Sequence, residues 1–228
     1  AGMLIAIPAV QYGWPIWAAL SFAFGCALAI GALNGWLVVK TGLPSFIVTL
    51  GFLFILRGVA IGIPRLMADR TQIGGVHDVI GNDWFAALFS GEVGEGFFLW
   101  LSEIGVIGTN FAGNPTVSGI PVSIVWWLGL TALATWVLLF TRFGNWIFAC
   151  GGDKEAARNV GVPVNLVKIV LFMFTAFAAC VFAALQVMDT GSADSIRGIL
   201  KELEAIIAVV IGGALLTGGY GSAIGASF

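Results

Sequence analysis

The chain alternates between long uncharged stretches and short segments that hold most of its charged residues. Asp, Glu, Lys and Arg are absent from residues 1–39, 104–141, 169–188 and 205–228. A helix needs about 20 apolar residues to cross the hydrocarbon core of a membrane, and each stretch is long enough to supply them. The pattern therefore predicts an all-α fold, a polytopic bundle of transmembrane helices.

Turn-forming residues divide these stretches into separate elements. Residues 1–10 are expected to end one span, and further spans are expected near 15–39, 45–63, 121–140 and 164–188. Residues 203–228 are apolar but rich in glycine, which favours a broken helix. Residues 64–121 are of mixed polarity and are expected to lie outside the membrane as a loop insertion.

Three pairs of glycines are spaced four residues apart within apolar segments. They are Gly31 and Gly35, Gly58 and Gly62, and Gly221 and Gly225. Small residues at this spacing allow the backbones of two membrane helices to approach closely. We therefore expect helix packing at all three pairs.

The composition places the chain in membrane lipid and excludes several other classes. Hydrophobic residues make up 59% of the chain and charged residues 10%, and the mean hydropathy is +1.02. These values lie outside the range of soluble domains. The net charge of −2 argues against a nucleic-acid partner. The three scattered cysteines have the pattern of apolar fillers, and the single His77 lacks companion ligands, so neither a metal site nor a cofactor is predicted.

The distribution of Lys and Arg predicts how the chain is oriented in the membrane. Residues 40–44 and 141–168 together hold five basic residues in 33 positions, whereas residues 64–121 and 189–203 hold four in 73. The first group is therefore predicted to be cytoplasmic. Residues 64–121 are predicted to be periplasmic, and residues 141–163 to form a cytoplasmic loop.

The charged segment "GGDKEAARNVGVP", residues 151–163, has the signals of a short helix from about Lys154 to Val160. Asp153 is a favourable N-cap, and Gly161 followed by Pro163 is a strong stop signal. A helix of about 10 Å cannot span a membrane and needs a surface on which to dock. On these features alone it could equally be an ordinary capped helix on a cytoplasmic surface.

Three segments, in order, resemble the permease subunits of ABC importers for ribose, xylose, fructose and related monosaccharides. They are "LPSFIVTLGFLFILRG" (residues 43–58), "GGDKEAARNVGV" (residues 151–162) and "ELEAIIAVVIGGALLTGGYGSAIGA" (residues 202–226). The resemblance implies one permease domain over residues 1–228 that lacks terminal helices, in a bacterial inner membrane. It also implies transport without covalent chemistry, with ATP hydrolysis in separate cytoplasmic ATP-binding subunits. The remaining partners implied are a periplasmic sugar-binding protein and a second permease copy.

The same resemblance makes the short cytoplasmic helix the coupling helix, which contacts the ATPase. The residues expected to take part are Gly152, Asp153, Lys154, Glu155, Ala156, Ala157, Arg158 and Gly161. The other candidates are polar groups in otherwise apolar spans, where they avoid lipid by facing the protein interior or a water-filled path. These translocation-pathway candidates are Asn34, Thr49, Arg57 and Gln186, with helix-to-helix hydrogen bonding as the alternative role.

A secondary transporter or channel and an intramembrane enzyme are the alternatives to the importer. A secondary transporter or channel for a small polar solute would be expected to place ionisable groups in mid-membrane, but Arg57 is the one charge inside a predicted span. An intramembrane enzyme would need paired catalytic groups in neighbouring spans, and no such pair stands out. The aromatic segments at residues 83–89 and 96–101 are interpreted as interfacial anchors, with contact to a binding protein as the alternative.

Overall fold

The computed structural model describes residues 1–68, 71–80, 86–94, 96, 98–100, 104, 119–215 and 217–227. Within these residues, four helices are long and apolar enough to cross a membrane. They are α2 (Ile16–Thr41), α3 (Ser45–Ala68), α6 (Val122–Phe140) and α9 (Val164–Thr190). The predicted all-α, polytopic fold is confirmed.

The structure corrects the predicted end of one span. α3 continues past Ile63 to Ala68, with Pro64 inside the helix. Proline lacks an N–H donor and usually kinks or breaks a helix, so the continuation of α3 through Pro64 is not expected from sequence patterns alone. A membrane helix can tolerate proline, and here the Pro64 side chain is fully buried.

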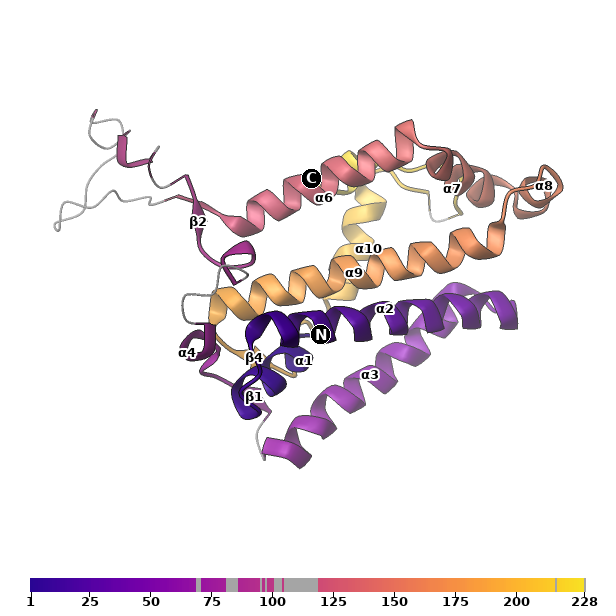
Figure 1. Ribbon diagram of the computed structural model, residues 1–228. Helices are drawn as coiled ribbons and strands as arrows, with labels where there is room; N and C mark the ends of the chain where they lie inside the picture. Colours follow the sequence, from indigo (N-terminus) through magenta and orange to yellow (C-terminus); the bar gives the residue numbers. More distant parts are fainter. Residues whose placement is uncertain are drawn as a thin grey trace.

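The core lies where the N-terminal residues pack against α2 and α9. α1 (Gly2–Ala6) continues into the π-helical turn η1 (Ile7–Gln11), and both contact α2. The largest fully buried side chains of this cluster include Ile5, Ile16, Leu20, Val181 and Met188. Cys180 is also fully buried there, as expected for an apolar filler. Figure 1 shows α2 and α9 side by side, with α1 beside the half of this pair where α2 begins and α9 ends.

α2 and α9 pack closely at the first of the predicted glycine pairs. A Cβ at Gly31 would lie 2.7 Å from the Phe172 carbonyl oxygen, and a Cβ at Gly35 would lie 2.7 Å from the Ile169 Cα. The prediction is therefore confirmed for this pair. At Gly58 and Gly62, by contrast, an added Cβ would meet no atom of the described residues within 4 Å, so the described part of the chain shows no close packing at this pair.

Short elements join at the end of the bundle where α2 begins and α9 ends. β1 (Gln72–Ile73) pairs antiparallel with β4 (Ala193–Asp194), and β2 (Glu92–Val93) pairs antiparallel with β3 (Ile120–Pro121). Between them lie α4 (Val76–Ile80) and the 3-10 turn η2 (Ala86–Leu88). Residues 83–85, 97 and 101 of the aromatic segments lie outside the described residues.

The opposite end holds the turn between α2 and α3 together with α7 (Arg142–Gly152) and α8 (Lys154–Asn159) (Figure 1). α7 was not predicted. Its signal was the N-cap residue Thr141, whose hydroxyl oxygen accepts the N–H of Gly144 at 3.1 Å. Both segments that were predicted to be cytoplasmic therefore lie at one end of the bundle.

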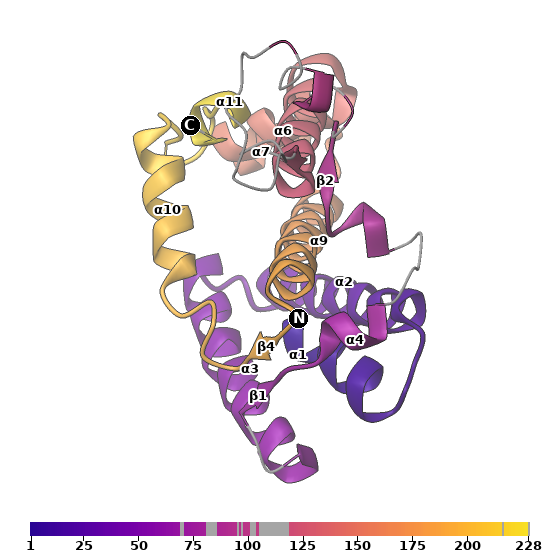
Figure 2. The ribbon, with the colours of Figure 1, turned by 90° about the vertical axis from the view of Figure 1, so that its left-hand side faces the viewer.

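The predicted break in the C-terminal apolar segment is confirmed. α10 (Lys201–Ile211) ends at Gly212, and α11 (Ala223–Ser227) begins after an irregular connection. α11 packs against α6. Figure 2 shows α10 extending from the side of α3 towards α7 and α11.

Candidate coupling helix and membrane sites

Asp153 caps the N-terminus of α8. Its Oδ1 accepts the N–H groups of Glu155 at 2.8 Å and Ala156 at 3.0 Å, while its own backbone is extended. The first N–H groups of a helix have no partner within the helix, so the carboxylate satisfies two of them and places negative charge at the positive end of the dipole. The predicted cap is confirmed.

Gly161 ends the helix in a Schellman motif. Its N–H donates to the Arg158 carbonyl at 3.0 Å, and the Val162 N–H donates to the Ala157 carbonyl at 3.0 Å. Gly161 has a φ of +86°, a conformation that glycine adopts without the strain of a Cβ. α8 ends at Asn159, one residue before the predicted end at Val160.

The two alanines of α8 lie in different environments. Ala157 is only 3% exposed and faces the chain's own interior, where α8 contacts α7 and α9. Ala156 is exposed, and so are Lys154, Glu155 and Arg158. We call these four exposed residues the α8 surface, because a partner protein can reach them; the last residue of the helix, Asn159, is exposed as well.

The junction between α7 and α8 contacts the irregular connection between α10 and α11. A Cβ at Gly151 would lie 2.5 Å from the Gly219 backbone nitrogen, and a Cβ at Gly218 would lie 2.6 Å from the Gly151 carbonyl oxygen. The two backbones can approach this closely only because these positions are glycines. The paired glycines at 151–152 and 218–219 were visible in the sequence, but nothing in it indicated that they meet.

The pathway candidates on α2 and the start of α3 have different hydrogen-bonding states. Thr49 donates to the carbonyl oxygens of Ser45 at 3.0 Å and Phe46 at 3.1 Å, so its hydroxyl is satisfied within its own helix. The Asn34 Oδ1 atom is buried and has no hydrogen-bond partner in the described part of the chain. Asn34 is therefore the stronger candidate for an interaction with water, solute or another subunit.

Arg57 lies in the middle of α3 and has a charged partner on another helix. Its Nη2 lies 3.2 Å from the Glu202 Oε1, in an ion pair between α3 and α10. The side chains are 34% and 31% exposed. The sequence reading missed Glu202 as a partner because the two residues lie 145 positions apart.

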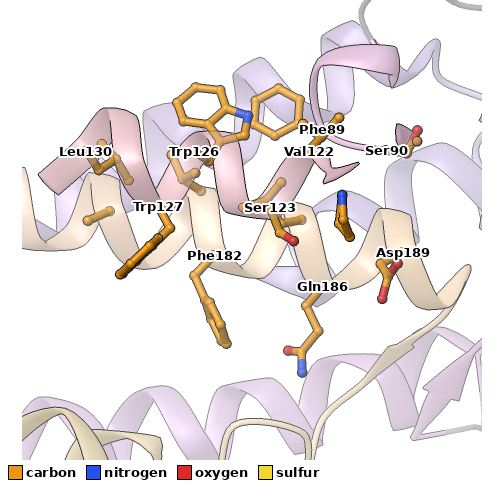
Figure 3. A pocket seen from close by; sticks show the side chains of 15 residues that line it. Phe89, Ser90, Val122, Ser123, Trp126, Trp127, Leu130, Phe182, Gln186 and Asp189 are labelled. Carbon is orange, nitrogen blue, oxygen red and sulfur yellow. The ribbon is translucent and has the colours of Figure 1, made fainter. Parts of the chain in front are cut away.

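Gln186 lines a pocket of about 460 Å³ between α6 and α9, near the end that carries the short strands. Figure 3 shows Trp127, Phe182, Gln186 and Asp189 projecting to the same side of the helix pair, with Ser123 beside them. Sequence reasoning identified only Gln186 among these residues. Among the described residues, no hydrogen bond joins any two of Asn34, Thr49, Arg57 and Gln186, so the structure does not assemble the four pathway candidates into one site.

The helices and the capped helix α8 define a multi-pass membrane protein with one short helix exposed at an end of its bundle. A family model described as the branched-chain amino acid transport system / permease component matches residues 1–228. The chain belongs to this family of permeases.

Curated relatives include several sugar permeases. The ribose import permease protein RbsC of Escherichia coli (strain K12) is 32% identical over 208 residues, covering 91% of this chain and 56% of that protein. The xylose transport system permease protein XylH of Haemophilus influenzae is 28% identical over 254 residues, covering 98% of this chain and 67% of that protein. The xylose/arabinose import permease protein XylH of Sulfolobus acidocaldarius is 31% identical over 207 residues, covering 90% and 48%.

The chain thus spans about half to two thirds of the length of these relatives. No solved structure matches the chain.

Proposed function

We propose that this chain belongs to the membrane-spanning subunit of an ATP-driven importer and forms part of the pathway for a monosaccharide. The relatives named above are permeases for ribose, xylose and arabinose, and they match nine tenths or more of the chain. The single observation that carries the proposal is α8, a capped helix of six residues with an exposed surface at the end of the bundle. A helix this short is not stable alone; its caps and the packing of Ala157 on α7 and α9 hold it in place, which leaves the α8 surface available to a partner.

The partner at the α8 surface is proposed to be a cytoplasmic ATP-binding subunit. Glu155 and Arg158 offer opposite charges three residues apart, on one side of the helix. Exposed Ala156 is small enough to let the helix backbone enter a groove. A periplasmic sugar-binding protein would deliver the sugar at the opposite end, and a second permease copy would complete the pathway.

The contacts described above suggest how a movement of α8 would reach the membrane helices. α8 is joined to α7 at Gly152, and the preceding Gly151 touches the connection between α10 and α11. α10 in turn carries Glu202, the partner of Arg57 on α3. We infer that closure of the ATPase dimer would displace α8 and, through this contact, tilt α10 against α3.

A second substrate class follows from the family description, which names branched-chain amino acids. A direct test is uptake into vesicles that contain the complete importer, isolated with its ATPase and binding protein. ATP inside the vesicles should drive accumulation of labelled ribose, xylose or arabinose but not of leucine, isoleucine or valine. Accumulation of the amino acids alone would overturn the sugar assignment, and uptake driven by an ion gradient without ATP would identify a secondary transporter.

A further inference from the structure

The pocket between α6 and α9 combines aromatic and polar side chains. None of its described lining residues belongs to α8 or to the elements that α8 is proposed to move. Ser123 and Trp127 lie one turn apart on α6, and Phe182, Gln186 and Asp189 follow one another along one side of α9. A volume of about 460 Å³ is within the range of roughly 300–1,000 Å³ that small-molecule sites occupy. The pocket is therefore large enough for a small solute.

The polar groups lie nearer the outer end of the bundle than the aromatic rings. Asp189 is close to the end of α9, and Phe182 precedes it by seven residues, about 10 Å along the helix axis. On α6, Ser123 is in the first turn and Trp127 is one turn deeper. Along the helix axes, the pocket is therefore polar at its mouth and aromatic one to two turns further along, where the Trp127 and Phe182 rings remain partly exposed.

Two of the polar side chains have unused hydrogen-bonding capacity. Neither the Asp189 carboxylate nor the Gln186 side-chain amide forms a hydrogen bond or ion pair within the described part of the chain. A carboxylate accepts hydrogen bonds, whereas a primary amide both donates and accepts them. Asp189 is exposed and Gln186 is half-buried, so both groups are open to a ligand, and their hydrogen-bonding atoms suit a hydroxylated ligand better than a lipid tail.

The wall of the pocket is held in place by contacts behind it. The Trp126 indole N–H donates to the Leu88 carbonyl at 2.7 Å, and its ring stacks on Phe89 with centroids 5.3 Å apart. These contacts fix η2 and the start of α6 relative to each other. The neighbouring residues Trp127 and Ser123 therefore lie on a helix whose position is fixed by these contacts.

A second hollow adjoins the mouth and shares Ser90, Gly91 and Asp189 with it. His77 lines this hollow, and its Nε2 lies 2.9 Å from the Met188 carbonyl oxygen. A carbonyl can only accept, so Nε2 donates this hydrogen bond. The mouth thus continues into a second hollow that is also lined by polar side chains.

The charged residues that line the pocket bear on whether it suits a sugar or an amino acid. Its described lining residues include the acidic Asp189 but neither Lys nor Arg. Asp189 could pair with the ammonium group of a zwitterionic amino acid, but the carboxylate of that amino acid would have no cationic partner among these lining residues. A neutral sugar leaves no charge unpaired, and its ring has an apolar face suited to the aromatic side chains.

We propose that this pocket binds a monosaccharide at the outer end of the transport pathway. Asp189 and Gln186 hydrogen-bond its hydroxyl groups, and Trp127 and Phe182 cover the apolar face of its ring. This inference rests on the proposed function and assigns residues to it.

The first test measures whether a sugar protects the pocket. Ser123→Cys, at an exposed pocket position with no assigned role in binding, is made in the complete permease after the native cysteines Cys26, Cys150 and Cys180 are replaced by alanine. Its reaction with a maleimide is followed with and without ribose or xylose. A sugar at about two to nine times its Kd should slow the reaction about threefold to tenfold by occupying the pocket. A rate unchanged by both sugars, or equally slowed by leucine, would overturn the proposal. Phospholipid that copurifies in the pocket and blocks the reaction regardless of sugar would also overturn it and identify a lipid site.

The second test compares matched variants in the uptake assay. Phe182→Ala should lower sugar uptake, whereas Phe174→Ala, also on α9 but outside the pocket, should not; the two side chains are 52% and 38% exposed. Asp189→Asn should impair uptake, and Thr135→Val on α6 serves as the polar control because its hydroxyl bonds the Thr131 carbonyl of its own helix. The two control variants, Phe174→Ala and Thr135→Val, should also hydrolyse ATP without sugar at the wild-type rate.

Wild-type uptake separates the two possible failures. If the wild-type importer accumulates no monosaccharide, the proposed function fails together with this inference. If it accumulates one and the pocket variants match their controls, the proposed function stands and the pocket assignment is wrong.

Discussion

Arg57 on α3 and Glu202 on α10 form an ion pair across 145 positions of sequence, with Nη2 and Oε1 3.2 Å apart. Glu202 is in the first turn of α10, where the helix dipole also favours a negative charge. α3 has few other described contacts with the rest of the chain, mainly with α2. The pair is therefore a main link between α3 and the C-terminal segment.

Reversing these charges tests that link. Arg57→Glu or Glu202→Arg alone places like charges together, and we expect the apparent Tm of the purified permease to fall by about 2–4 °C, the shift that corresponds to about 1 kcal/mol. The double variant should recover most of this loss, as measured by thermal unfolding in detergent. A double variant no more stable than the two single variants would show that the pair does not hold α3 against α10.

The packing of α2 on α9 provides a prediction with a control in the same helix. Gly31→Val would force a side chain against the Phe172 backbone, and overpacking of this kind costs about 1–3 kcal/mol. Gly25→Val should be tolerated, because a Cβ at Gly25 meets nothing within 4 Å. Thermal unfolding of the two variants measures the difference, and equal stability would contradict the close approach at Gly31.

The contact between Gly151 and Gly219 predicts a coupling defect. Gly151→Ala would push the connection between α10 and α11 away from α7, since the added Cβ would lie 2.5 Å from the Gly219 nitrogen. We expect the ATPase to remain bound while sugar uptake per ATP hydrolysed falls. Both quantities can be measured in the same vesicles, and an unchanged ratio would rule out this route from α8 to the membrane helices.

Local features of the fold could be predicted because neighbouring residues determine them. The N-cap Asp153 and the stop at Gly161 depend on a few successive residues, and both lie as expected. α7 was missed because its pattern of charged, aromatic and small residues is short and was interpreted as loop. The continuation of α3 through Pro64 is not expected from sequence patterns alone, because proline ends most helices outside membranes.

The candidate sites depended on contacts that sequence spacing does not reveal. Gln186 was a candidate because it is polar in an apolar span, but Asp189 and Phe182 became candidates only when the structure placed them beside α6. The burial of Ala157 could not be predicted either, because it depends on how α8 packs on α7 and α9.

Because Ala157 is buried and Ala156 is exposed, substitutions at these two positions test the orientation of α8. Ala157→Trp should destabilise the permease, because the site has no room for a larger side chain. Ala156→Trp should leave the permease folded and weaken its association with the ATPase. Thermal unfolding and copurification of the ATPase measure the two effects, and equal behaviour of the variants would contradict the orientation of α8.

The most direct measurement of the central claim is photocrosslinking from the α8 surface in the assembled importer. A photoreactive phenylalanine replaces Ala156, and a control replaces Leu128, an exposed residue of α6 far from α8 in the sequence. The account predicts a covalent adduct with the ATP-binding subunit from position 156 and none from position 128. An intact complex that gives no ATPase adduct from position 156 would contradict the claim that α8 couples ATP hydrolysis to transport.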